Sequence, residues 1–231
     1  MAFKRPFKPK TKDADCNFYK IFWIYIIGGI LGCLAETIWC YFAFGGYSNR
    51  SSNLFFPMSN VWGAGCALFS ILLHNNQNSK PFHLFIKGYI FGGAFEFLCG
   101  FVCQLVLGVT FWDYSGIPLS IGNYVNLVFC AFWGLVAIAW AKWIYPFLSR
   151  LLEKVPQKKR RFATRCTVCL VVFTSVISCL ALIRMSERHK NIPPRNFLER
   201  HLDQYYPDHL LGSTFPKMKY LDTGEYIKDL P

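Results

Sequence analysis

The chain has 231 residues, of which 53% are hydrophobic and 16% are charged. Soluble domains contain about 25% charged residues, so this composition excludes a typical soluble enzyme and an intrinsically disordered chain. It indicates an all-α integral membrane protein with one domain. The net charge of +12 raises nucleic acid as a partner, but the basic residues flank the apolar segments, so we expect a lipid bilayer and no nucleic acid.

A helix needs about 20 mostly apolar residues to cross the hydrocarbon core of a bilayer. Five segments meet this requirement and predict about five transmembrane helices: Phe18–Phe44, Leu54–Leu73, Leu84–Phe111, Ile121–Ala141 and Cys166–Ile183. The first segment is too long for a cleaved signal peptide, and no small-residue cleavage site follows it. The first and third segments each contain one glutamate, Glu36 and Glu96.

The placement of Lys and Arg predicts the orientation of these helices. With the N-terminus inside, the cytoplasmic segments hold 16 basic residues, whereas the first two outer loops hold only Arg50. The cytoplasmic segments are Met1–Lys20, the loop with Lys80 and Lys87, and Lys142–Arg165. We therefore predict a multi-pass protein of the cell membrane, either an inner or a plasma membrane, with a cytoplasmic N-terminus. The odd number of spans places the C-terminal tail outside.

The predicted organisation has five parts. They are a basic cytoplasmic N-terminus (1–17), a four-span membrane core (18–145), an amphipathic basic cytoplasmic loop (146–165), a fifth span (166–183) and a polar tail with a short amphipathic helix (184–231).

The membrane core contains an internal repeat with an offset of 60 residues. Phe22–Glu36 and Phe82–Glu96 are identical at six of fifteen positions, including both glutamates. Each repeat unit comprises two spans, so the two glutamate-bearing helices run in the same direction, as in a parallel repeat. Glycines spaced by four precede each glutamate and predict close helix packing in lipid: Gly28, Gly32, Gly88, Gly92 and, after the second glutamate, Gly100.

A charged carboxylate inside the membrane costs roughly 2.5–3.5 kcal/mol, so Glu36 and Glu96 are expected to face protein and approach each other. Two interpretations are open. The pair could form an ion, proton or substrate site, or two protonated glutamates could join helices by hydrogen bonds. The polar partners we expect nearby are Arg50, Asn49, Asn53, Asn123 and Asn126.

The second outer loop contains Trp112, Asp113 and Tyr114. Its aromatic residues suit the headgroup region of a bilayer. Asp113 could line an outer vestibule or cap the following turn, and the sequence favours neither.

The last cytoplasmic loop has apolar residues on one face of a predicted helix and then a run of four cations, Lys158, Lys159, Arg160 and Arg161. This pattern favours contact with an anionic lipid surface, and docking of a partner is the alternative. In the tail, Asn196 and Glu199 form a capping-box pattern that predicts a short helix ending at Pro207.

Motifs for enzymatic chemistry are absent from the sequence. There is no phosphate-binding loop, no zinc-protease motif and no hydrolase nucleophile motif. The lone Cys166-x-x-Cys169 pair is more typical of packed thiols than of a metal or redox site. We therefore expect no enzyme activity, no cofactor and no metal in this chain.

Several motifs together resemble a known family. They are Glu36 with Trp39 and Tyr41, Gly63-x-Gly65, Glu96, Trp112-Asp113-Tyr114-Ser115, Trp133-Gly134, Asn123-Tyr124-Val125-Asn126 and the tail motif from Leu198 to Asp208. Over nearly the whole chain they are similar to the bacterial Putative ABC-transporter type IV permease family. This resemblance implies a polytopic protein of the bacterial inner membrane, and it favours a role in transport.

Two functions remain open from the sequence. The first is a transporter permease, or an accessory membrane subunit, that works with a separate ATPase or couples to protons through its glutamates. A homodimer would enlarge the small space that four core helices enclose. The second is a membrane scaffold, a sensor or a lipid-directed protein without transport activity.

Overall fold

The computed structural model describes residues 16–227, which are mostly helical. The predicted basic N-terminus, 1–17, lies almost wholly outside the described residues. The helices are α1 (Phe18–Phe44), α2 (Asn60–Leu73), α3 (Pro81–Leu107), α4 (Leu127–Ala139), the π-helix η1 (Trp140–Ile144), α5 (Tyr145–Glu153), α6 (Gln157–His189), α7 (Phe197–Tyr205) and α8 (Asp208–Thr214). Four two-residue strands form two small antiparallel pairs: β1 (Val109–Thr110) with β4 (Lys219–Tyr220), and β2 (Ser120–Ile121) with β3 (Val125–Asn126).

Four of the described helical segments are long and apolar enough to cross a membrane: Phe18–Ala43, Pro81–Leu107, Leu127–Glu153 and Gln157–His189. The predicted second span is shorter than expected, because α2 has 14 residues and measures about 21 Å. Its first part, through Pro57, is a loop folded around the hydroxyl of Ser51, and α2 begins only after Ser59 caps the backbone N–H of Trp62. The count of five spans is therefore unconfirmed.

The core consists of two helical hairpins, α1–α2 and α3–α4, that repeat the same close contacts. A Cβ atom on Gly32 would lie 2.4 Å from Cβ of Trp62, and one on Gly92 would lie 2.5 Å from Cβ of Trp133. One turn earlier, Gly28 and Gly88 pack in the same way against Cys66 and Ala137. These glycines pack helix against helix as the sequence predicts, since no side chain fits between the backbones.

Gly100 differs from the other four glycines, because the atoms nearest to it belong to a loop and not to another helix. A Cβ atom there would lie 3.3 Å from the ring of Trp112 and 3.3 Å from the ring of Tyr124. Both rings belong to the α3–α4 connection, which folds back over the end of α3. Gly100 therefore makes room for loop aromatics.

The segment predicted as one cytoplasmic loop, 146–165, is divided between two helices. Its first part belongs to α5, which continues α4 through the π-helix η1. Pro146 lacks the N–H that an α-helix needs at this position, which gives a physical reason for the change in hydrogen-bonding. On α5, Leu148 and Leu152 are buried against the bundle, whereas Phe147 and Leu151 are exposed.

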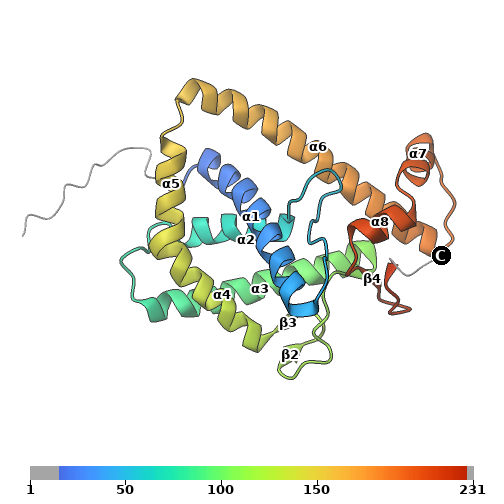
Figure 1. Cartoon of the computed structure of the whole chain (residues 1–231), viewed down its shortest axis with the longest axis horizontal. Helices are drawn as coiled ribbons and strands as arrows, with labels where there is room; N and C mark the ends of the chain where they lie inside the picture. The colour runs from blue at the N-terminus through green and yellow to red at the C-terminus, as the bar shows by residue number, and fades with distance from the viewer. Residues whose placement is uncertain (1–15, 228–231) are drawn as a thin grey trace, which may run out of the picture.

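The long helix α6 contains the predicted fifth span and carries the chain along one side of the molecule to the C-terminal elements (Figure 1). There α7, α8 and β4 gather near the end of α3 (Figure 1). Val109 of β1 pairs with Tyr220 of β4, and both are buried with Met185 of α6 in one apolar cluster. The tail thus lies on the same side as the loops that follow α1 and α3.

Ion pairs fasten the tail to α6. Arg184 is 2% exposed and donates two hydrogen bonds to the carboxylate of Asp203, at 2.8 and 3.0 Å. Arg188 binds Asp203 and Asp208. Half of the predicted capping box is present, since Asn196 accepts the N–H of Glu199 at 2.9 Å and α7 begins at Phe197. The Glu199 carboxylate accepts the backbone N–H of Arg195 at 2.6 Å in place of that of Asn196.

Candidate functional site

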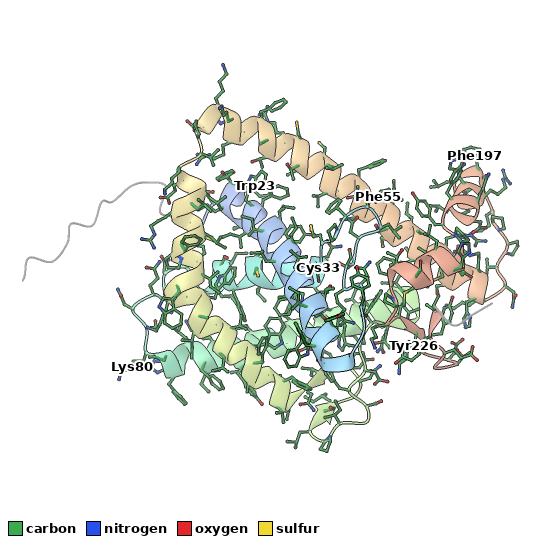
Figure 2. All side chains as sticks on the ribbon, viewed as in Figure 1. Trp23, Cys33, Phe55, Lys80, Phe197 and Tyr226 are labelled. Carbon is green, nitrogen blue, oxygen red and sulfur yellow. The ribbon has the colours of Figure 1, made fainter. Side chains whose placement is uncertain are left out.

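A cavity of about 290 Å³ lies where the two hairpins meet the loops that follow α1 and α3 and the tail. Both glutamates of the repeat, Glu36 and Glu96, line it. The other lining residues are Asn49, Arg50, Ser51, Ser52, Ser59, Val61, Trp62, Phe111, Trp112, Tyr114, Phe129, Phe132, Trp133, Phe215 and Lys217. Figure 2 labels Cys33, which precedes Glu36 by one turn on α1 and lies near the middle of the molecule in this view.

Glu36 is held by one cation and one indole. Nε of Arg50 donates to Oε1 of Glu36 at 2.7 Å, and Nη2 of Arg50 donates to the same oxygen. The indole Nε1 of Trp62 donates to the second oxygen, Oε2, at 2.8 Å. Arg50 is the only basic residue of the first two predicted outer loops, and the structure pairs it with the glutamate of the first repeat.

Glu96 is held by two neutral donors. The hydroxyl of Tyr114 donates to Oε1 of Glu96 at 2.7 Å, and the indole Nε1 of Trp133 donates to Oε2 at 2.8 Å. Burial and the neighbouring Glu96 carboxylate raise the pKa of Tyr114, so its hydroxyl keeps the proton that it donates. The indole bond is the same in both repeats, but the second partner differs.

The two carboxylates share the cavity without a direct hydrogen bond between them among the described residues. The two tryptophans that bind them, Trp62 and Trp133, have ring centroids 5.5 Å apart with a 40° angle between planes. The sequence predicted that the glutamates approach each other, and in the structure both line one cavity, each bound to its own tryptophan.

Of the expected polar partners, Arg50 and Asn49 line the cavity, whereas Asn53 and Asn126 make their hydrogen bonds elsewhere. Asn53 does not line the cavity, because its amide donates to Thr174 of α6 at 3.3 Å and its oxygen accepts the N–H of Phe55. Asn126 caps α4 by accepting the N–H of Val128 at 2.9 Å. These asparagines use their hydrogen-bonding capacity to shape the loops that surround the site.

Asp113 lies outside the glutamate cavity, in a second hollow of about 590 Å³ between the α3–α4 loop and the tail, where Asn123 is also found. Its carboxylate accepts hydrogen bonds from the ammonium group of Lys219 at 2.5 Å and from the backbone N–H of Ser115 at 2.9 Å. These donors lower the pKa of Asp113 to about 2. Asp113 therefore caps its own turn and binds the tail to this loop.

The comparisons with known proteins identify the family. A family model described as Putative ABC-transporter type IV matches residues 23–179, more than half of the chain. The chain belongs to this family. The match includes both hairpins and most of α6, whereas the tail, which the resemblance was expected to include, lies beyond it. No curated protein and no solved structure matches the chain.

Family membership and the long apolar helices together identify a multi-pass membrane protein of the transporter type. The site residues that sequence reasoning missed in this ABC-transporter-type protein are Trp62 and Trp133, which bind the glutamates. The Trp-Gly pair in each repeat was visible in the sequence, but its link to the carboxylates was not. Phe215 and Lys217 of the tail were also missed, because nothing in the sequence places the tail beside the hairpins.

The four cations that the sequence placed in a cytoplasmic loop lie in the first turns of α6, at the end of the molecule opposite the cavity. Lys158, Lys159 and Arg161 are exposed, while the guanidinium of Arg160 stacks over the ring of Tyr19 at 4.6 Å. Nearby, Lys20 is fully buried and binds Glu153 at 2.5 Å, which ties α1 to α5. The helix macrodipole disfavours cations at a helix N-terminus, so an anionic neighbour would stabilise this cluster.

Within residues 16–227, no group of three or more His, Cys, Asp or Glu side chains is placed to hold a metal ion. All ten cysteines are free thiols, and Cys166 and Cys169 are exposed on α6. These cysteines are spread over several helices and do not form one site.

Proposed function

We propose that this chain is the permease, or an accessory membrane subunit, of an ABC-type transport system, and that the Glu36–Glu96 cavity is its intramembrane site. The observation that carries the proposal is the duplicated carboxylate–indole unit, which places two glutamates on one cavity. Ionisable groups inside a membrane protein are costly and usually mark a path for an ion or substrate. The cavity is near the lower end of the size range of small-molecule sites.

The energy source in this proposal is a separate ATPase. Family membership supports it, and the sequence contains no phosphate-binding loop that would bind ATP in this chain. We propose further that the chain itself catalyses no reaction. The ATPase would meet the end of the molecule that carries the α2–α3 turn and α5, since the cavity and the tail occupy the other end.

Purification from native membranes in mild detergent tests the transport role. We expect a nucleotide-binding subunit to purify with the tagged chain and to hydrolyse ATP in the complex. A chain that purifies without any ATPase, from cells in which its deletion has a phenotype, would contradict the proposal.

Complementation of a deletion strain tests the role of the carboxylates. Glu96→Gln keeps a side chain that can accept from Trp133, but it removes the charge, so we expect normal expression and loss of function. If Glu96→Gln rescues the strain as well as the wild-type chain does, the carboxylate serves only to join helices by hydrogen bonds.

The lipid-directed alternative is favoured by one observation, the exposed cations at the start of α6. Contact of these cations with anionic headgroups would orient the protein and is compatible with transport. Lipid binding as the sole function of the chain would leave the cavity unexplained.

A further inference from the structure

The two halves of the cavity differ in charge although their helices repeat. In the first half the guanidinium of Arg50 compensates Glu36. In the second half Glu96 takes its two hydrogen bonds from the uncharged Tyr114 and Trp133. Lys217 also lines the cavity and already takes part in an interaction of its own. Glu96 therefore offers the cavity a carboxylate that is hydrogen-bonded and oriented without a guanidinium partner.

Aromatic side chains form much of the wall around this carboxylate. Trp133 packs against Trp62 at 5.5 Å between ring centroids, and Tyr114 packs against Phe129 at 5.5 Å. Trp112 and Phe132 also line the cavity. Aromatic faces attract organic cations, and the attraction is stronger where water is excluded.

We propose that the cavity binds a small organic cation, with its ammonium group at Glu96 and its alkyl groups against the surrounding aromatic rings. This inference rests on the proposed function, because it names the ligand class of the same site. At Glu96 a single ammonium group supplies the positive charge that Arg50 supplies at Glu36. A volume of about 290 Å³ holds a molecule with several methyl groups and excludes large substrates.

Calorimetric titration of the purified full chain in detergent micelles tests the proposal with two probes of equal shape. Choline carries a quaternary ammonium, and 3,3-dimethylbutan-1-ol is its uncharged isostere. We expect choline to bind at least roughly tenfold more tightly than the alcohol, because only choline gains the cation–π and carboxylate attraction. Protein-free micelles give the background heat for each probe.

Two variants locate the binding. Glu96→Gln should lower choline affinity at least roughly tenfold and leave the weak affinity for the alcohol unchanged. Glu225→Gln, which removes an exposed carboxylate of the tail, should change neither. If Glu96→Gln fails to fold, the comparison of the two probes on the wild-type chain still decides.

Equal affinity for both probes, or full choline binding by Glu96→Gln, would overturn the inference. The outcomes are separable from those of the proposed function. Selective choline binding in a chain that has no ATPase partner would contradict the transport role alone. An ATPase complex that binds both probes equally would contradict only the ligand class.

Discussion

Trp62 and Trp133 lie with their ring centroids 5.5 Å apart, and each donates its indole N–H to the glutamate of the helix before it. The two repeats therefore contact each other through this tryptophan pair, and each tryptophan binds the carboxylate of its own repeat. Each indole packs on a glycine, Gly32 or Gly92, that stands one turn before the glutamate. The glycine and the glutamate on one helix and the tryptophan on the other therefore act as one packing unit.

The glycine contacts predict a large cost for a single methyl group. Gly92→Ala places a Cβ atom 2.5 Å from Cβ of Trp133, and the helices must separate to admit it. We expect the free energy of unfolding to fall by about 1–3 kcal/mol, the usual cost of overpacking. Thermal or denaturant unfolding in detergent measures it.

Gly116→Ala is the matched control for Gly92→Ala. A Cβ atom at Gly116 would meet nothing within 4 Å, so we expect no more than a small change. Equal stability of the two variants would show that the hairpin does not pack as closely as the structure has it.

The indole donors predict the effect of a conservative substitution. Trp133→Phe keeps an aromatic ring but removes the N–H that Glu96 accepts, so we expect a loss of about 1 kcal/mol in unfolding free energy. Trp39→Phe, at a position where the side chain is 68% exposed, should have little effect. A silent Trp133→Phe would mean that this hydrogen bond contributes nothing to folding.

The Asp113–Lys219 pair predicts a dependence of tail docking on pH. Lys219 and the N–H of Ser115 lower the pKa of Asp113 to about 2 in the folded chain, below its ordinary value of about 3.9. The stabilisation is therefore complete above about pH 4 and is lost as the pH falls toward 2. It should be less than about 1 kcal/mol, because water screens a pair so near the surface.

Unfolding of wild type and Asp113→Asn at pH 5 and pH 3 measures this contribution. The variant should be less stable than wild type at pH 5, and the difference should shrink at pH 3. The charge-swapped double variant, Asp113→Lys with Lys219→Asp, should recover part of the loss. A difference that is equal at both pH values would argue against the ion pair.

The exposed cations of α6 predict binding of anionic lipid. Lys158→Glu with Lys159→Glu removes two cations and leaves the Arg160–Tyr19 stack in place. Each basic residue near an anionic surface contributes about 1 kcal/mol, so retention of anionic lipid should fall roughly 30-fold or more. Native mass spectrometry of the purified chain measures the retained lipid.

Lys190→Glu is the control for the lipid experiment, since Lys190 is exposed at the other end of α6. It should leave lipid retention unchanged. If the double variant retains as much anionic lipid as the wild type, these cations dock a partner instead.

The sequence by itself determined the membrane class, the long apolar helices, the repeat and the glycine contacts that build each hairpin. These features follow from composition and from spacing within one helix, where i and i+4 residues share a face. The N-cap at Asn196 was predictable for the same reason, because its contact with Glu199 lies within one turn.

Only the tertiary structure decided which residues meet the glutamates. Trp62 lies 26 residues after Glu36 and Trp133 lies 37 after Glu96, so these contacts depend on how each hairpin closes. Docking of the tail on the α3–α4 loop depends on a longer connection, since Lys219 meets Asp113 across 106 residues. The span predicted from the sequence, Leu54–Leu73, is longer than the helix α2. Local hydropathy does not show that the hydroxyl of Ser51 folds the start of that segment into a loop.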